Sequence, residues 1–213
     1  MRLSVLVSFL VLTSAERAVS QNAYFKLGQQ ALIDGNFKAA IKQLERGRLI
    51  DSTDANALYM LGYSYYHSDN YLKSIAVFTK ELAVEPADAH AYYYRGRAQF
   101  RLGMESQIPA EKEKYLLGAI IDLTKAIRIN PSNTKLSVFY QNRAIAYCEY
   151  GSFRLQNTPK FFDRARAIDA LKASIADLQK IYDADHTRSD IVTLLEISKQ
   201  KLAVANATAS VSH

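Results

Sequence analysis

Apolar side chains recur at every third or fourth residue along most of the chain between residues 21 and 205. This spacing places them on one face of an α-helix. Polar segments rich in Gly, Asn, Asp and Ser interrupt the pattern at short intervals, for example at residues 34–36 and 68–70. Such residues favour tight turns. The pattern therefore predicts an all-α chain of helices joined by turns.

The hydrophobic pattern itself repeats every 34 residues. Matching residue pairs that end in glycine mark the first three repeats: Leu27-Gly28, Leu61-Gly62 and Arg95-Gly96.

Small residues follow at Ala40 and Ser74, and large ones at Leu44 and Phe78. Small side chains let two antiparallel helices approach closely, while larger ones such as Leu27, Leu44 and Phe37 fill the space between hairpins. The sequence therefore predicts helical hairpins that bury their apolar faces by stacking.

Short turns are predicted between the two helices of a hairpin. The first two are Gly35-Asn36-Phe37 and Asp69-Asn70-Tyr71, in which Gly, Asn and Asp tolerate the backbone angles of a tight turn. By the same pattern, Gly151-Ser152-Phe153 is predicted to be the turn of the fourth hairpin. Pro86 and Pro131 are expected to close the second and third units, because proline stops a helix.

The third and fourth hairpins contain extra residues, near 104–114 and 154–171. The extra residues follow Gly103 in the third hairpin, and in the fourth the small residues Ala144 and Ser174 stand 30 positions apart. Both insertions fall at the same inter-helix turn and should project from one side. Pro109 and Pro159 lie early in them, so residues 110–129 and 160–182 are predicted to be long helices. A tolerated loop insertion and a second binding surface both fit this pattern.

The exact period and the matching columns of small and large residues resemble the tetratricopeptide (TPR) repeat family. The resemblance implies a right-handed TPR-type superhelix of about four helix-turn-helix repeats plus a C-terminal capping helix. The repeats fall at about 21–54, 55–88, 89–133 and 137–187, the capping helix at 189–205 and a disordered tail at 206–213. In the capping helix, Glu196 takes the place of the contact glycine. Family likeness also implies a concave groove, lined by the first helix of each repeat, that holds a peptide or helix of a partner protein.

Helix periodicity, in which residues i, i+4 and i+7 share a face, indicates which side chains would line that groove. The predicted groove residues are Phe25, Gln29, Tyr59, Tyr63, Tyr66, His67, Tyr93, Arg97, Phe100 and Arg101. The fourth repeat would add Gln141, Ile145 and Glu149. Tyrosine and arginine dominate binding hot spots because they bury a large area and keep a hydrogen-bonding end. Alternatively, several of these aromatic residues pack in the core and the two arginines are solvated.

Some family members clamp the C-terminal carboxylate of chaperones with groove Lys, Asn and Arg residues. This sequence departs from that pattern at the matching positions. There it has Phe25, Gln29, Met60, His90 and Tyr94. The sequence therefore predicts a groove without the carboxylate clamp.

The first twenty residues have the layout of a secretory signal peptide. Arg2 precedes an apolar segment from Leu3 to Leu12, which is about half the length that a membrane-spanning helix needs. Ala18 and Ser20 suit cleavage before Gln21, and Ala15 offers a second site. We expect an exported protein, periplasmic or secreted, or one of the secretory pathway in a eukaryote. Retention of residues 1–20 as an anchor stays open; once they are removed, no integral membrane segment is expected.

Charge and residue chemistry argue against catalysis and nucleic-acid binding. The formal net charge is +6, but the basic residues are interspersed with acidic ones rather than gathered into a run. The four histidines, at 67, 90, 186 and 213, lack metal-ligand spacing. The lone Cys148 has no adjacent base and forms no internal disulfide. We therefore expect no catalytic residue, no metal site and no cofactor, and no nucleic-acid partner.

Three functions remain open. The leading one is a non-catalytic adaptor or scaffold whose groove binds a partner peptide or helix. A second is a structural or assembly subunit of a cell-envelope complex that uses the long third and fourth hairpins. A third is a carbohydrate- or peptidoglycan-binding module, in which aromatic side chains stack on sugar rings. The sequence does not identify the partner, host, oligomeric state or pathway.

Overall fold

The computed structural model describes residues 22–130, 135–156 and 160–207, and within these ranges all regular secondary structure is helical. The predicted signal peptide, Pro131 and Pro159 lie outside the described residues. The chain divides into two compact units, which meet in sequence at Ala87 and Asp88.

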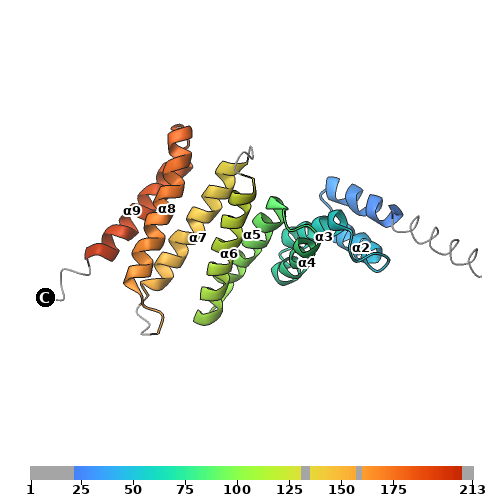
Figure 1. Ribbon diagram of the computed structural model, residues 1–213, viewed down its shortest axis with the longest axis horizontal. Helices are drawn as coiled ribbons and strands as arrows, with labels where there is room; N and C mark the ends of the chain where they lie inside the picture. Colours follow the sequence, from blue (N-terminus) through green and yellow to red (C-terminus); the bar gives the residue numbers. More distant parts are fainter. Residues whose placement is uncertain (1–21, 131–134, 157–159, 208–213) are drawn as a thin grey trace, which may run out of the picture. The chain divides into compact units, whose positions relative to one another are not determined.

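Unit 1 contains two short helical hairpins. Its helices are residues 22–33, α2 (Phe37–Arg48), α3 (Ala55–His67) and α4 (Tyr71–Val84) (Figure 1). A Cβ atom added at Gly28 would lie 2.6 Å from Cγ of Leu44, and one added at Gly62 would lie 2.9 Å from the Phe78 ring. The glycines thus allow the close helix contacts that their period predicted.

The turns of these two hairpins are confirmed where the sequence placed them. Gly35 and Asp69 occupy equivalent positions and both have positive φ, 69° and 55°, a conformation that Gly and Asp tolerate better than most residues. Asn36 then caps α2 by accepting a hydrogen bond from the backbone N–H of Ala39, at 3.0 Å. Leu27, expected to pack between hairpins, is 53% exposed, because it lies on the outermost described helix.

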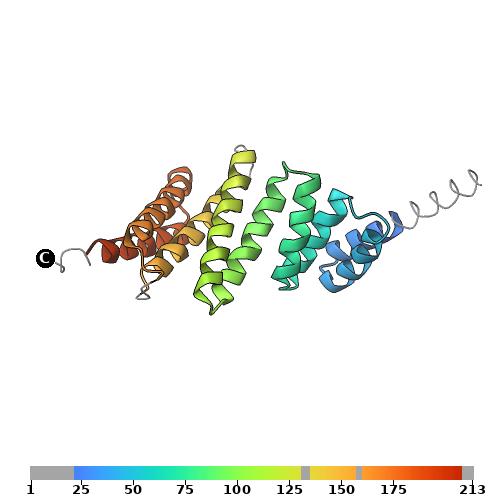
Figure 2. The ribbon, with the colours of Figure 1, turned by 60° about the horizontal axis from the view of Figure 1, so that its bottom comes forward.

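Unit 2 contains two longer hairpins and a final single helix. Its helices are α5 (Ala89–Glu105), α6 (Pro109–Ile129), α7 (Leu136–Arg154), α8 (Arg164–Ala184) and α9 (Ser189–Ala207) (Figures 1 and 2). Each helix packs against the next one in the chain, and α9 also contacts α7. Phe139, Leu116 and Leu123 lie in a core shared by α5, α6 and α7.

The extra residues of unit 2 lengthen the helices. In the third hairpin, α5 continues to Glu105 and α6 begins at Pro109. The prediction of a turn at Gly151 is wrong, since α7 continues through it to Arg154. Gly103 and Gly151 instead allow a second close crossing, one heptad beyond the first. Added Cβ atoms there would lie 3.2 Å from Cγ of Leu116 and 2.9 Å from Cγ of Leu171.

Buried ion pairs join the two helices of each long hairpin. Asp122 accepts bonds from Nε and Nη2 of Arg95, at 2.7 and 2.8 Å, and a third from Gln99 at 2.6 Å. Arg143 and Asp177 form the same two-bond pair, at 2.7 and 2.8 Å. Burial opposes the charge of Arg143, but the bonds to Asp177 outweigh it and raise the Arg143 pKa. Each pair thus satisfies two charges that lie inside a hairpin.

The last helix is fixed to α8 at both its middle and its end. The hydroxyl groups of Ser174 and Ser198 are 3.0 Å apart and fully buried between the two helices. Arg164 donates to the carbonyl oxygens of Ala205 and Asn206, at 2.6 and 3.0 Å. The helix therefore extends to Ala207, two residues beyond the predicted end at 205. Glu196, at the position of the contact glycine, is exposed.

Candidate partner-binding surface

A row of aromatic side chains lies along α3 in unit 1. Tyr59, Tyr63 and His67 are four residues apart and therefore share one face of the helix. The ring centroids of Tyr59 and Tyr63 are 6.4 Å apart, and those of Tyr63 and His67 are 4.2 Å apart. The two tyrosines are half-buried and His67 is exposed. The spacing of the predicted groove residues thus corresponds to a connected surface on this helix.

Phe37 extends the row from the neighbouring hairpin. Its ring stacks on His67, with centroids 4.8 Å apart and planes inclined by 15°, and lies 6.2 Å from Tyr63. The sequence predicted that Phe37 fills the space between hairpins, and its contacts with His67 and Tyr63 agree with that prediction. We call Tyr59, Tyr63, His67 and Phe37 the aromatic row. Rings from two hairpins therefore form one surface.

The opposite side of α3 is fixed to α2. The Tyr65 hydroxyl donates to Glu45 at 2.9 Å, and burial together with this bond raises the pKa of Tyr65 to about 12. Ser74 of α4 donates to the carbonyl oxygen of Gly62 at 2.9 Å. Tyr66, another predicted groove residue, is buried against Tyr71, with ring centroids 5.7 Å apart. These contacts hold α3 in place and so position the aromatic row.

A hollow of about 550 Å³ opens beside the end of the row. It lies between the turns of the two hairpins and is lined by residues 34–38 and 67–69. Phe37 and His67 belong to both the row and the hollow, which we call the turn hollow. An extended ligand on the row would therefore reach polar groups at its end.

The first helix carries the two remaining predicted residues of unit 1. Phe25 is half-buried and Gln29 is exposed. Arg46 of α2 lies over the ring of Tyr24, 5.9 Å from its centroid. This helix thus presents a mixture of aromatic and polar side chains.

In unit 2, the predicted groove residues are divided between core and surface. Tyr93 is 6% exposed and stacks on Phe139, with ring centroids 4.6 Å apart. Its hydroxyl accepts a 3.3 Å bond from Asn142, and the Arg97 guanidinium lies 5.4 Å from its ring. Tyr93 therefore joins α5 to α7.

The remaining predicted residues of α5 lie nearer the surface. Phe100 packs partly against the core of unit 2, and Arg101 is exposed. His90 lies edge-on to Phe139, with ring centroids 5.9 Å apart. The face of α5 around Tyr93 thus mixes packing and exposed side chains.

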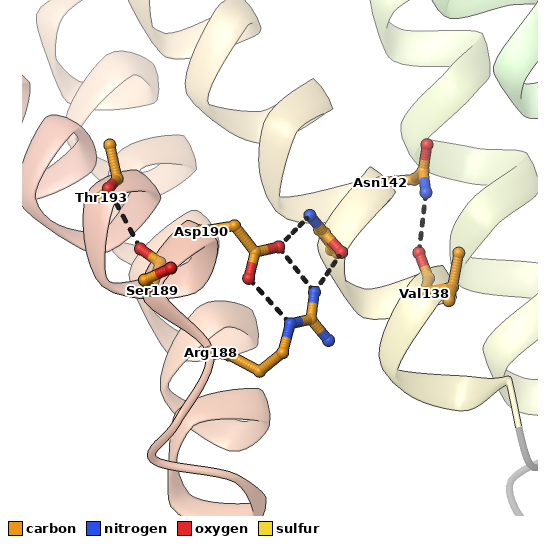
Figure 3. Close-up of polar contacts among 7 residues, drawn as sticks. Val138, Asn142, Arg188, Ser189, Asp190 and Thr193 are labelled. Atoms are coloured by element: carbon orange, nitrogen blue, oxygen red, sulfur yellow. Dashed lines mark hydrogen bonds and ion pairs between the residues drawn. The ribbon is translucent and has the colours of Figure 1, made fainter.

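The fourth repeat uses its predicted groove residues to hold α9. Gln141 donates to Asp190 at 3.2 Å and accepts from Arg188 at 3.0 Å. Arg188 also pairs with Asp190 through two bonds, as Figure 3 shows. Glu149 pairs with Lys201 at 3.5 Å. These polar contacts stabilise the end of unit 2.

Another face of α7 carries an aromatic stripe that sequence reasoning missed. Tyr140, Tyr147 and Tyr150 follow one another at helical spacing, and the Arg143 guanidinium lies 5.5 Å from the ring of Tyr140 and 5.8 Å from that of Tyr147. The heptad spacing of the first two tyrosines was a signal for it. Tyr140 and Tyr147 are partly buried against the core of unit 2 and Tyr150 is buried in it, which gives all three a packing role.

Neither a metal site nor a membrane span is found in the described ranges. There, His, Cys, Asp and Glu side chains nowhere gather in a group of three or more that could hold a metal ion. Cys148 is buried. None of the helices described has the length and hydropathy that crossing a membrane requires.

Comparison with solved structures identifies the architecture. A crystal structure of MamA protein superposes with a TM-score of 0.55 at 20% identity, over 91% of this chain and 96% of that one. TTC0263, a thermophilic TPR protein of Thermus thermophilus, gives 0.53 at 19% identity, over 84% and 99%. The second TPR domain of human RPAP3, in complex with the HSP70 peptide SGPTIEEVD, gives 0.50 at 18%, over 62% and 97%.

These similarities confirm the predicted fold class, an all-α TPR-type helical solenoid. No protein-family model matches the sequence, and a search of curated protein sequences also gives no match. At these identities the likeness concerns the fold. A shared fold does not determine function, which depends on the residues at the surface of this chain.

Proposed function

We propose that this protein is an exported, non-catalytic binding scaffold that holds an extended or helical segment of a partner protein along the aromatic row of unit 1. The observation that carries the proposal is the connected set of half-buried and exposed rings on α3 and α2, with centroids between 4.2 and 6.4 Å apart. Such rings offer a partner a large apolar area without requiring many side chains to become ordered.

The row suits binding because it is already formed. Its rings contact one another, and α3 is fixed from behind by the bonds of Tyr65 and Ser74. A rigid surface loses little conformational entropy when it binds, so the ordering of the partner segment is the main cost.

The comparisons support a peptide-binding role in general terms. The RPAP3 TPR domain, similar in fold, is in complex with an HSP70 peptide. This chain has Phe25, Gln29 and Met60 at positions where the carboxylate clamp of the family has Lys, Asn or Arg. The proposed ligand is therefore an internal segment with apolar side chains rather than a chain end held by its carboxylate.

Export rests on the sequence of residues 1–20, an Arg followed by an apolar segment and small residues. The N-terminus of the protein purified from its native host tests this proposal by mass spectrometry. A chain that begins near Gln21 supports export through a cleaved signal peptide. A chain that begins at Met1 in the cytosolic fraction contradicts it.

The test of the binding surface is partner capture by substituted chains. Tyr63→Ala should reduce capture about tenfold or more, because it removes a hot-spot ring from the middle of the row. Arg97→Ala tests α5 separately, and the two substitutions together test both helices. Leu72→Ala is the matched control, since Leu72 is an exposed apolar residue of the same unit, on α4. Unchanged capture by Tyr63→Ala, with normal helicity, rejects the row as the binding surface.

A second candidate function is assembly through the long hairpins of unit 2. It is favoured by two exposed apolar side chains at the end of the third hairpin, Met104 at 40% and Ile108 at 56%. Deletion of residues 105–112 separates the two functions. Loss of complex assembly with intact peptide capture would support this candidate, and loss of neither would exclude it.

A further inference from the structure

The turn hollow of unit 1 has the chemistry of a subsite for a cationic side chain. It lies where the turns of the first two hairpins come together, and its volume of about 550 Å³ is ample for one long side chain. Phe37 and His67, stacked 4.8 Å apart, form its aromatic wall. Asp34 and Asp69 line it from the two turns. An aromatic wall beside carboxylates matches the alkyl stem and charged end of lysine or arginine.

Neutral groups orient the two aspartates of the hollow. Within the described residues neither forms an ion pair. Asp34 Oδ1 accepts a hydrogen bond from Gln30 at 2.9 Å, and Asp69 Oδ1 accepts one from the Tyr71 hydroxyl. Both bonds come from neutral groups, which orient the carboxylates without neutralising them. Lys38 is the one permanently cationic side chain among the described residues that line the hollow, so the carboxylates outnumber it.

Local backbone geometry explains why the carboxylates face one hollow. Gly35 and Asp69 both have positive φ at equivalent positions of consecutive turns. The turns are therefore similar in shape and place residues 34–38 and 67–69 side by side. The hairpins of unit 2 are longer, and α5 continues to Glu105 where α3 ends at His67. A pair of adjacent tight turns is thus a feature of unit 1 among the described hairpins.

We propose that the turn hollow receives a lysine or arginine side chain of the partner segment, with its charge near Asp34 and Asp69 and its stem beside Phe37 and His67. The proposal rests on the function proposed above, because the hollow adjoins the aromatic row. It adds a requirement on the partner: a basic residue next to an apolar stretch. A partner segment with an acidic residue at that place would be repelled.

Titration with small probes tests the subsite without the partner. n-Butylguanidinium carries the stem and charge of arginine, and n-butylurea is its neutral isostere. Backbone amide shifts of residues 34–38 and 67–69 in the two-dimensional NMR spectrum of the whole chain report binding. We expect saturable shifts with n-butylguanidinium, and an affinity for n-butylurea that is lower by about two- to fivefold, as expected for exposed charge pairs.

The double variant Asp34→Asn with Asp69→Asn tests whether the two carboxylates cause the preference for n-butylguanidinium. Asparagine keeps the size and hydrogen-bond acceptor of each side chain and tolerates positive φ, so the turns should stay folded. We expect this variant to bind the two probes equally weakly. Glu85→Gln is the control, because it removes one exposed carboxylate of unit 1 away from the hollow. It should leave the preference for n-butylguanidinium unchanged.

Three results would overturn the subsite: equal affinity for the two probes in the unsubstituted chain, an unchanged preference in the double variant, or shifts confined to other residues. Partner capture by Tyr63→Ala reports on the aromatic row alone. Reduced capture with no probe binding would reject the subsite and keep the row. Probe binding with unaltered capture would reject the row and keep the subsite.

Discussion

The short hairpins of unit 1 and the long hairpins of unit 2 differ in the side chains that join the two helices of a hairpin. In the second hairpin, Leu61 directly precedes the contact glycine Gly62, and Val77 directly precedes Phe78, the large residue that Gly62 meets. Leu61 and Val77 lie in one apolar cluster. At the equivalent positions the third hairpin has Arg95 paired with Asp122. The fourth has Arg143 paired with Asp177. One repeat position thus accepts either an apolar pair or a buried ion pair.

The apolar pair and the ion pair differ in how strictly they fix the register of the two helices. Apolar pairs tolerate small shifts of one helix along the other, whereas a two-bond Arg–Asp pair is satisfied in one register. The long hairpins have 17 and 21 residues in α5 and α6, against 13 and 14 in α3 and α4. Longer helices offer more alternative registers. We infer that the ion pairs of unit 2 fix the register of its hairpins, while the short turns do so in unit 1.

The largest expected effect comes from breaking one ion pair. Asp177→Ala leaves the Arg143 guanidinium largely buried, with 14% of its side chain exposed and without its carboxylate partner. We expect the free energy of unfolding of unit 2 to fall by about 3–5 kcal/mol, the usual cost of a buried unpaired charge. Urea denaturation followed by circular dichroism measures it. A loss below about 1 kcal/mol would show that the pair lies in a more solvated site.

The second crossing of the fourth hairpin is tested by Gly151→Val. A Cβ atom at this position would lie 2.9 Å from Cγ of Leu171 and 3.1 Å from the carbonyl oxygen of Ala167, which belongs to the backbone of α8. We expect a loss of about 1–3 kcal/mol from overpacking. Ser152→Ala, one residue further along, should cost less than about 0.5 kcal/mol. Equal effects of the two substitutions would mean that Gly151 is not at a close contact.

A double substitution gives the fourth hairpin the apolar pair of the second. Arg143→Leu with Asp177→Val places the residue types of positions 61 and 77 in unit 2. Because both charges are removed together, unfolding free energy should stay within about 1.5 kcal/mol of the original or rise. If the ion pair fixes the register, amide hydrogen exchange in α8 should become faster even though the free energy of unfolding does not fall by more than about 1.5 kcal/mol. Unaltered exchange would contradict the register interpretation.

The smallest expected effect is a pH dependence at the end of unit 2. The hydrogen bonds and charge of Arg188 lower the pKa of Asp190 from 3.8 to about 2. A lowered pKa means that the contact stabilises the fold fully above about pH 4 and is lost as the pH falls through about 2. Arg188→Gln should raise the Asp190 pKa toward its ordinary value, as measured from its carboxyl carbon shift. A pKa insensitive to Arg188 would exclude this pairing in solution.

The fold was predictable because small and large residues recur at a fixed spacing of 34 positions. Such a spacing is kept where each repeat makes the same helix contact. Gly28 and Gly62 lie at close helix contacts as their period predicted, although the side chains nearest to them are Leu44 and Phe78, which the pattern had assigned to the space between hairpins. Gly151 was misread because a glycine that starts a turn and a glycine at a helix crossing look identical in sequence. The partners of Arg95 and Arg143 could not be assigned, since the insertions change the separation along the chain between the two helices of each hairpin.

The candidate surface was predictable only in part. The spacing of Tyr59, Tyr63 and His67 along one helix identified three members of the aromatic row. Phe37 comes from another hairpin, and helix periodicity carries no information about contacts between hairpins. The same limitation applies to Tyr93, which periodicity placed in the groove and which stacks on Phe139 of α7.

Site-specific photocross-linking shows directly whether the aromatic row binds the partner. A photoreactive phenylalanine analogue replaces Tyr63 in one chain and Leu72, an exposed residue of α4, in the other. The two chains are irradiated in the native host and the cross-linked products are compared. We expect a discrete partner adduct at Tyr63, at least about tenfold more abundant than at Leu72. Equal labelling at the two positions, or a stronger adduct at Leu72, would show that the aromatic row is not the partner-binding surface.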